Sequence, residues 1–141
     1  MRRNLAIDDL GDLVALRLLA VLSTYRHDGT VLLSPVWHEW RDGGFSVVTG
    51  SRDVKAAHLR RDPRASIVVC EHTPPYRGVE VRCQARLATA AAGEVQRIAS
   101  RYLGPDAGAA YAESAHDDVL IRLEPGDLRA WDFADELGTG L

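Results

Sequence analysis

Two cations, Arg52 and Lys55, stand three residues apart where a helix is expected to begin. A helix N-terminus presents unpaired N–H groups and the positive end of the helix dipole, so it favours anions. An arginine and a lysine in the first turn add to this preference. The residues therefore predict a site for a phosphate or a carboxylate. A solvated basic turn, whose cations only balance nearby acids, is the alternative that the spacing leaves open.

The elements on either side of the two cations would position them. Residues 45–50 predict a strand, because they are rich in β-forming side chains and follow a double glycine. Ser51 or Asp53 is a suitable N-cap for the following helix. Pro63 ends that helix, since proline disfavours helical geometry in the residue before it. A strand, a tight turn and a helix start thus converge on the predicted anion site.

Aromatic residues near Pro35 form a second group that could bind a ligand. His38 lies between Trp37 and Trp40, and an aromatic pair beside a β-bulge can line a flat, conjugated ligand. The alternative is that one tryptophan belongs to the core and the other to an interface. Trp131 near the C-terminus has the same ambiguity. A histidine inside a strand is more often a hydrogen-bonded structural group than a catalyst.

The sequence contains no familiar catalytic motif. It has no GxSxG, HExxH or Walker loop, and its five histidines lack metal-ligand spacing, so it indicates no metal site and assigns no catalytic residue. Cys70 and Cys83 lie in strand-like segments without CxxC pairing. This pattern favours buried free thiols over a disulfide or a metal site.

Length and charge exclude some classes of protein. A chain of 141 residues fits one domain, residues 1–141, with a core of its own. The net charge of −3 argues against a general nucleic-acid binder. The longest apolar run, residues 13–22, contains Arg17 and is shorter than the roughly 20 residues of a membrane span. No signal peptide is apparent at the start of the chain, and we expect a cytoplasmic protein without a membrane partner.

Hydrophobic periodicity predicts a mainly β fold with small helices. Strands are expected at residues 18–25, 31–40, 45–50, 65–72, 79–87, 119–123 and 128–133, and helices at 8–17, between Gly50 and Pro63, at 91–103 and at 105–114. Asp28-Gly29 and Gly43-Gly44 are hairpin signals. Because proline cannot donate to a sheet ladder, Pro35 predicts a bulge or an unpaired stretch. Six or seven antiparallel strands indicate a closed or half-closed barrel, which removes exposed edges.

The order of these elements resembles the pyridoxamine 5′-phosphate oxidase-like split β-barrel superfamily. More narrowly, the sequence is similar to its branch of flavin/deazaflavin oxidoreductases that use coenzyme F420. The resemblance covers residues 10–133, and its most specific part is the run Lys55-x-x-x-Leu59-Arg60-Arg61-Asp62-Pro63-Arg64. The other matching segments are Leu22-Ser23-Thr24, Asp28-Gly29-Thr30, Ser34-Pro35-Val36-Trp37, residues 47–66 and residues 76–85.

The resemblance implies an antiparallel split β-barrel with peripheral helices that forms a homodimer. It also implies a cofactor in a groove at the dimer interface, with coenzyme F420 expected and FMN as the alternative. The residues implied to bind the cofactor are Ser34, Pro35, Val36, Val48, Thr49, Gly50, Ser51, Arg52 and Lys55, with Trp131 at the place where the partner subunit approaches the ring. A long acidic F420 tail would benefit from further basic residues, which Arg60, Arg61, Arg64 and Arg77 could supply.

The implied activity is transfer of a hydride from reduced F420 to a conjugated small molecule, such as a tetrapyrrole, a quinone or an enone. FMN-dependent redox chemistry on the same barrel is one alternative. A carrier that binds a flavin, a deazaflavin or haem without turning it over is another, because the sequence offers no obvious proton donor.

Overall fold

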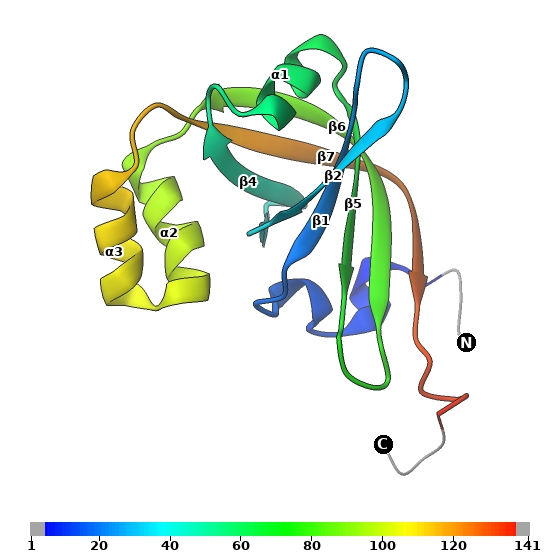
Figure 1. The fold of residues 1–141 in the computed structure, drawn as a ribbon. Coiled ribbons are helices and arrows are strands. Elements are labelled where there is room, and N and C mark those ends of the chain that lie inside the picture. The colour runs from blue at the N-terminus through cyan, green and yellow to red at the C-terminus, as the bar shows by residue number, and fades with distance from the viewer. Residues whose placement is uncertain (1–4, 138–141) are drawn as a thin grey trace.

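A computed structural model of the chain describes residues 5–137 (Figure 1). The strands are β1 (Ala20–Tyr25), β2 (Val31–Val36), β3 (Glu39–Arg41), β4 (Gly44–Gly50), β5 (Arg64–Cys70), β6 (Gly78–Thr89) and β7 (Asp118–Trp131). The helices are α1 (Val54–Arg61), α2 (Ala92–Leu103) and α3 (Pro105–Ser114), preceded by the 3₁₀ turns η1 (Ile7–Leu10) and η2 (Leu13–Ala15). No helix between residues 5 and 137 is long and apolar enough to cross a membrane.

In the described residues the strands form one antiparallel sheet in the order β2-β1-β5-β6-β7-β4-β3. Its two edge strands, β2 and β3, are separated in the chain only by Trp37 and His38. Three Cα–Cα steps span at most about 11 Å, so the two edges must approach each other at this corner. The sheet therefore curls strongly, as Figure 1 shows. The predicted half-closed barrel follows from this short connection.

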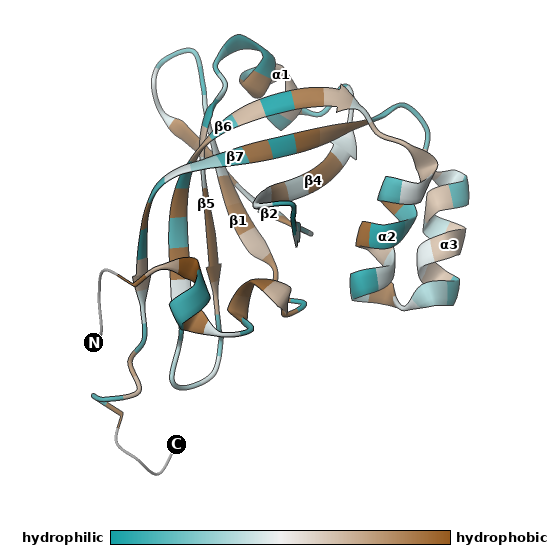
Figure 2. Cartoon of the chain, turned by 180° about the vertical axis from the view of Figure 1, so that it is seen from behind, coloured by the Kyte–Doolittle hydropathy of each residue, from teal (hydrophilic) through white to brown (hydrophobic). Residues whose placement is uncertain are grey.

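Alternating side chains on the curled sheet build the core. Along β6, Val79, Val81, Cys83 and Ala85 are buried, as the period-two pattern predicts, and hydrophobic and hydrophilic bands alternate along the strand in Figure 2. The largest side chains that are fully shielded from solvent are Phe45, Leu10, Leu13, Leu22, Ile67, Ile121 and Leu123. One face of the sheet is thus apolar and covered, while the other face is polar along β6 and carries exposed apolar side chains on β2.

The expected bulge at Pro35 is wrong. β1 and β2 pair without a register shift, and Pro35 lies directly opposite Val21. β2 is an edge strand, and a proline is tolerated there when its nitrogen faces away from the neighbouring strand. The strand ends at Val36 instead, before the two-residue connection to β3.

The C-terminal strands also differ from the prediction. Instead of two strands around a turn, β7 is one long strand that runs along β6. Val81 pairs with Leu128 and Cys83 with Pro125, so β7 advances three residues where β6 advances two. The glycine and aspartate between Pro125 and Leu128 therefore accommodate a β-bulge, which bends the strand without ending it.

The helix expected at residues 8–17 is replaced by η1 and η2. Gly11 separates them and has a φ of 62° and a ψ of −120°, which lies outside the helical region. The remaining segments are four and three residues long, the length at which 3₁₀ geometry is common. Their apolar side chains still enter the core, because Leu10 and Leu13 are buried.

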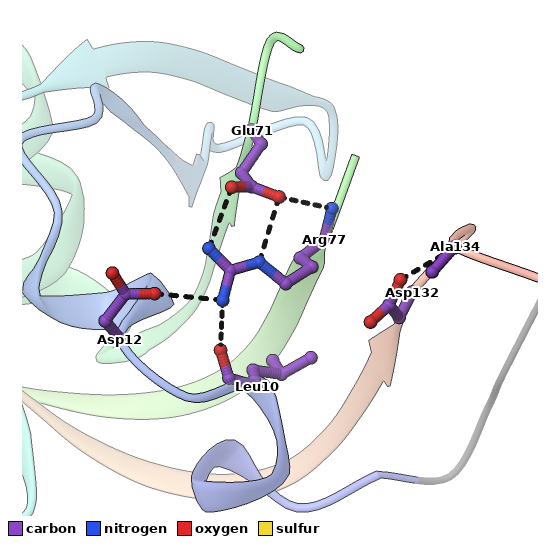
Figure 3. A network of polar contacts seen from close by, with 6 residues as sticks. All are labelled: Leu10, Asp12, Glu71, Arg77, Asp132 and Ala134. Carbon is purple, nitrogen blue, oxygen red and sulfur yellow. Dashed lines mark hydrogen bonds and ion pairs between the residues drawn. The ribbon is translucent and has the colours of Figure 1, made fainter. Parts of the chain in front are cut away.

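A polar network around Arg77 ties this N-terminal segment to the loop between β5 and β6 (Figure 3). The Arg77 guanidinium donates to the Leu10 carbonyl at 2.7 Å and to the Asp12 carboxylate at 2.9 Å. It also binds Glu71 through two nitrogens, at 3.0 and 2.8 Å. These bonds to Arg77 lower the pKa of the Glu71 carboxyl. Arg77 therefore closes the end of the barrel that η1 covers.

α2 and α3 form a helical pair beside β4 (Figure 1). Their contact depends on Gly108, because a Cβ atom there would lie 2.1 Å from the Ser100 hydroxyl and 2.6 Å from the Ser100 Cα. Gly93 in α2 offers a comparison, since a Cβ there would meet no atom within 4 Å. The two helices thus approach each other closely at one glycine.

Gly108→Ala is expected to lower the free energy of unfolding by about 1–3 kcal/mol, because the added methyl overpacks a backbone contact. Gly93→Ala is the matched control and should change it by less than about 0.5 kcal/mol or stabilise slightly. Urea denaturation of both variants measures the difference. Equal effects would contradict the close helix contact.

Candidate functional site

A pocket of about 370 Å³ opens between the end of β2, the end of β4, α1 and α3. Its lining combines apolar, aromatic and polar side chains: Leu19, Pro35, Val36, Trp37, Val48, Thr49, Lys55 and Tyr111. Five of these residues belong to the set that the sequence analysis assigned to a cofactor: Pro35, Val36, Val48, Thr49 and Lys55. The pocket brings together segments that are distant in sequence, and its size falls within the usual range for a small-molecule site.

The polar side of the pocket is built around the start of α1. Asp53 is the N-cap, as one of the two predicted alternatives, and its carboxylate accepts from the Lys55 backbone N–H at 3.4 Å. The same carboxylate accepts from the Lys55 ammonium and from the Thr49 hydroxyl, both at 2.8 Å. The hydrogen bond from Lys55, followed by that from Thr49, lowers the pKa of Asp53 against the opposing effect of burial.

This arrangement fixes the position of the Lys55 ammonium. The side chain is 14% exposed and is paired with Asp53, so an anion in the pocket would share the lysine with an internal carboxylate. Arg52 is exposed and forms no hydrogen bond or ion pair with residues 5–137. Only Lys55 therefore lies in the first turn of α1, as a positioned cation; Arg52, which was expected in the same turn, precedes the N-cap Asp53 and lies outside the pocket lining.

The neighbouring predicted residues have structural partners. The Ser51 N–H donates to the Asp117 carbonyl at 2.9 Å, and the Ser51 carbonyl accepts from Arg60 at 2.8 Å. Gly50 ends β4 opposite Asp118, and Ser34 pairs with Leu22 in the adjoining strand β1. Gly50, Ser51 and Ser34 are half-buried and flank the pocket lining along the chain.

The arginines that were considered for an acidic tail are occupied. Arg61 bonds the Tyr25 carbonyl, and Arg60 bonds Ser51. Arg64 forms a two-pronged ion pair with Asp62, and these hydrogen bonds lower the pKa of the half-buried Asp62 carboxyl to about 2. Arg77 belongs to the network of Figure 3. Each guanidinium thus has a role within the chain.

The structure separates the three residues whose roles the sequence left open. Trp37 lines the pocket, and its ring stacks on Tyr102 with centroids 5.3 Å apart and planes 9° apart. Trp40 packs edge-on against the buried ring of Phe45 at 4.8 Å. His38 is fully buried. Of this group only Trp37 is available to a ligand in the pocket.

α2 holds the connection that carries Trp37. The Tyr102 hydroxyl accepts from the His38 N–H at 3.0 Å and donates to the Leu18 carbonyl at 2.9 Å. Arg101 donates to the His38 carbonyl at 2.6 Å and to the Leu16 carbonyl at 3.0 Å. The backbone between β2 and β3 is thereby fixed, and with it the aromatic wall of the pocket.

The His38 imidazole is a structural group. Its Nδ1 lies 3.1 Å from the Tyr102 hydroxyl, and its Nε2 is buried without a hydrogen-bond partner among the described residues. Burial, together with the nearby Arg101 charge, lowers the pKa of His38 to about 4. The ring is therefore neutral near pH 7 and is enclosed in the fold, away from the pocket.

The sequence analysis missed Tyr111. It lies on α3, and its ring meets Trp37 with centroids 5.4 Å apart at an angle of 58°. One signal was available in the sequence. α3 consists mostly of small residues and has no apolar face for a tyrosine to extend, so a large aromatic residue there suggests a contact outside the core. Its proximity to Trp37 follows only from the packing of α2 and α3.

Trp131 lies at the far end of β7 from the pocket, opposite Gly78. A Cβ atom on Gly78 would lie 2.3 Å from the Trp131 ring, so the glycine makes room for the indole. The Arg129 guanidinium lies over the same ring at 4.9 Å. Within one chain Trp131 is separate from the other predicted residues.

The cysteines agree in part with their prediction. Cys83 is buried and Cys70 half-buried, and both are free thiols. Burial and the nearby Glu124 raise the pKa of Cys83 to about 12, so this thiol is unreactive near neutral pH.

Comparison with known proteins identifies the fold. The family model for pyridoxamine 5′-phosphate oxidase matches residues 8–132. No curated protein sequence matches the chain. The structure resembles a conserved hypothetical protein from Mycobacterium tuberculosis with a TM-score of 0.79 and 24% identity, over 96% of this chain and 89% of that one.

Two further structures are similar. One is described as an F420 reductase, with a TM-score of 0.69 and 23% identity, over 83% of this chain and 93% of that one. The other is the haem storage protein HutZ from Vibrio cholerae, with a TM-score of 0.69 and 16% identity, over 86% and 92%. At these identities the likeness shows the fold, and the predicted antiparallel split β-barrel with peripheral helices is confirmed.

The stability of the protein is expected to depend on pH through His38. The folded pKa of about 4 lies below the usual 6.5, so the unfolded state binds more protons between these values. Stability is therefore fully present above pH 6.5 and falls as the pH drops towards 4, by on the order of 3 kcal/mol. Urea denaturation at several pH values measures this slope. His38→Gln should flatten it, and an unchanged slope in that variant would contradict the assignment.

Proposed function

Because this chain belongs to the pyridoxamine 5′-phosphate oxidase family, we propose that its pocket binds a flavin-type cofactor and that the protein is an F420H2-dependent reductase. One observation carries the proposal: Lys55 of α1 and the apolar side chains of β2 and β4 line the same pocket. This combination suits a cofactor that has a flat ring and a phosphate.

The residues present fit such a group. Pro35, Val36 and Val48 provide an apolar surface for a planar ring, and Trp37 adds an aromatic one. Lys55 would hold the phosphate, with Arg52 as a second cation. Backbone at Ser34, Thr49, Gly50 and Ser51 would contact the ring and its ribityl chain.

The protein residues would act mainly by positioning. When bound, reduced F420 supplies a hydride to the acceptor, and a proton from solvent completes the two-electron reduction. The apolar lining excludes water from the ring, and the clamp of α2 on the Trp37-His38 backbone holds one wall in place. Asp53 holds the Lys55 ammonium at the pocket. The acceptor would be a conjugated small molecule.

FMN is the direct rival, because both cofactors have a similar ring and a proximal phosphate. The F420 tail needs additional cations, and of the arginines near α1 only Arg52 has no partner within residues 5–137. The resemblance of the motifs to F420-dependent enzymes supports F420, as does the structural likeness to an F420 reductase.

A carrier without catalytic turnover is the second candidate. Of the residues that line the pocket, none is a carboxylate or a histidine, which leaves Lys55 and the Tyr111 hydroxyl as the titratable groups. The fold is also that of a haem storage protein. Mixing the protein with reduced F420 and quinones, enones or biliverdin discriminates the two, since a carrier would not accelerate the return of absorbance at about 420 nm.

We also propose a homodimer across the uncovered face of the sheet. Leu33 and Val31 on this face of β2 are 65% and 41% exposed. Residues that are paired across neighbouring strands point to the same face of a sheet. Gly78 pairs with Trp131 and Glu80 with Arg129, and both Gly78 and Glu80 pair in turn with residues of β5 that point to the uncovered face. Trp131 is therefore on the same face as Leu33 and Val31. A partner subunit packed on this face could bring its own Trp131 to the pocket.

The cytoplasmic location and the single domain stay predictions.

Light scattering after size-exclusion chromatography is expected to give twice the monomer mass of 15.4 kDa. Leu33→Glu should shift the protein towards monomer, since it places a charge in an apolar interface. Leu103→Glu, at an exposed leucine on α2, is the control. A native protein that is monomeric at micromolar concentration would contradict the dimer and the shared site.

Fluorescence titration with F420 and with FMN tests the cofactor. We expect micromolar or tighter binding of F420. Binding of FMN without any response to F420 would favour the rival, and binding of neither would overturn the proposal.

Lys55→Ala is expected to weaken cofactor binding by roughly 10- to 150-fold, the value of a charge-assisted hydrogen bond of about 1.5–3 kcal/mol. Arg61→Ala, at the other end of α1, is the control and should cost much less. In Lys55→Ala the Asp53 carboxylate loses its counter-ion and would repel the cofactor phosphate. The double variant Asp53→Asn/Lys55→Ala removes this repulsion, so that the loss which remains reports the attraction between Lys55 and the phosphate. Equal small losses for Lys55→Ala and Arg61→Ala would mean that the basic turn is only a solvated face.

A further inference from the structure

Arg82 on β6 carries a charge that has no counter-ion among the described residues. Its side chain is exposed and forms no hydrogen bond or ion pair with residues 5–137. The other arginines of β5, β6 and β7 all have partners: Arg64 pairs with Asp62, Arg86 with Glu124 and Arg129 with Glu80, and Arg122 donates to the Asp42 carbonyl. The pairings within one chain thus leave the Arg82 guanidinium without an anion.

The strand register places Arg82 on the uncovered face of the sheet, in line with Leu33. Ser23 pairs with Leu33 on one side and with Ser66 on the other, and Ser66 pairs with Arg82. Residues paired across neighbouring strands point to the same face, so these four side chains form one row across β2, β1, β5 and β6. Arg82 therefore lies on the surface that a second subunit would cover in the proposed homodimer.

The β-bulge of β7 brings a carboxylate next to this arginine. Gly126 and Asp127 both lie opposite Arg82, and a Cβ atom on Gly126 would lie only 3.2 Å from the Arg82 carbonyl oxygen. A bulge of this kind can redirect a side chain. Asp127 is exposed and lines a hollow of about 220 Å³ together with Arg82, yet the two side chains do not form an ion pair. In the part of the chain that the structure describes, Asp127 has no other partner either.

A partner subunit on this face would bury both charges, and a buried charge without a counter-ion is costly. In a dimer with two-fold symmetry, every contact between two different residues occurs twice, once in each direction. An arginine and an aspartate that lie side by side can therefore each pair with the opposite charge of the partner subunit. A second hollow of about 670 Å³, which Arg82 also lines, leaves room for side chains of the partner.

We propose that Arg82 pairs with Asp127 of the partner subunit, and that the two equivalent ion pairs set the register of the homodimer. The inference rests on the homodimer proposed above and identifies the residues that select a second copy of this chain as the partner. Exposed apolar side chains such as Leu33 favour association without fixing its direction. Paired opposite charges fix the direction, because any other register brings like charges together or leaves a charge unpaired.

Sedimentation equilibrium of the full chain tests the pair by charge reversal. Arg82→Asp and Asp127→Arg each place like charges at both contacts, so each is expected to raise the Kd of the dimer about 100-fold or more. The double variant Arg82→Asp/Asp127→Arg restores opposite charges and should return to within about tenfold of the native Kd. Glu113→Arg, an exposed charge reversal on α3, is the matched control and should leave the Kd unchanged.

Co-expression of the two single variants, each with its own affinity tag, distinguishes a pair between subunits from a pair within one chain. A mixed dimer of Arg82→Asp with Asp127→Arg has opposite charges at both contacts, whereas either variant alone has like charges. We expect each tag to capture the other variant in a 1:1 ratio, with a Kd near that of the native dimer. Co-expression also recovers a variant that would not fold without its complement.

The remaining outcomes separate this inference from the proposals on which it rests. A native dimer whose Kd is unaffected by either reversal would overturn the ion pair and leave the homodimer in place. Restoration in the double variant without capture between the single variants would assign the pair to one chain and overturn the inference, as would co-expressed variants that form no soluble dimer. A monomeric native protein would overturn both the pair and the homodimer. Mutual capture by a protein that binds neither F420 nor FMN would support the pair and overturn the reductase.

Discussion

The fold and the pocket both depend on the hydrogen bonds that α2 makes to the short connection between β2 and β3. Two residues, Trp37 and His38, must bring the two edges of the sheet together, and this leaves their backbone groups outside any ladder. Buried backbone groups without partners are costly. Tyr102 and Arg101 supply partners for the His38 N–H and carbonyl, and the same two side chains bond the Leu18 and Leu16 carbonyls before β1. One helix therefore closes the barrel corner and positions the N-terminal segment.

The same connection determines which aromatic residue faces the pocket. Because His38 enters the core and Trp40 packs on Phe45, Trp37 between β2 and His38 remains at the pocket. Its contact with Tyr102 makes it an extension of the core as well as a wall of the site. The cost is a buried imidazole nitrogen without a partner, which is tolerated while the ring is neutral.

The start of α1 shows how the anion site is balanced. Asp53 is both the N-cap and the counter-ion of Lys55, and Lys55 is the one charged residue among those that line the pocket, so the pocket carries little net charge. In the proposed function, a ligand phosphate would compete with a carboxylate that caps the helix. The affinity of such a site depends on the difference in free energy between the pairing of Lys55 with the ligand and its pairing with Asp53. Because Asp53 already holds the Lys55 side chain in place, less conformational entropy of that side chain would be lost on binding.

The sequence by itself determined the elements whose signals are local. The hairpins, the alternation of β6 and the place of Lys55 in the first turn of α1 follow from residue type and spacing, because neighbouring residues alone set these geometries. The N-cap of α1 was narrowed to Ser51 or Asp53, and the structure selects Asp53. It misjudged Pro35 and the β7 bulge, since whether a strand is an edge or continues past a turn signal depends on its partner. Only the tertiary structure placed Tyr111 against Trp37 and separated Trp131 from the pocket. The position of Tyr111 beside Trp37 depends on how the helices pack, and the distance of Trp131 from the pocket depends on how the sheet curves. Both result from many contacts between residues that are far apart in the chain.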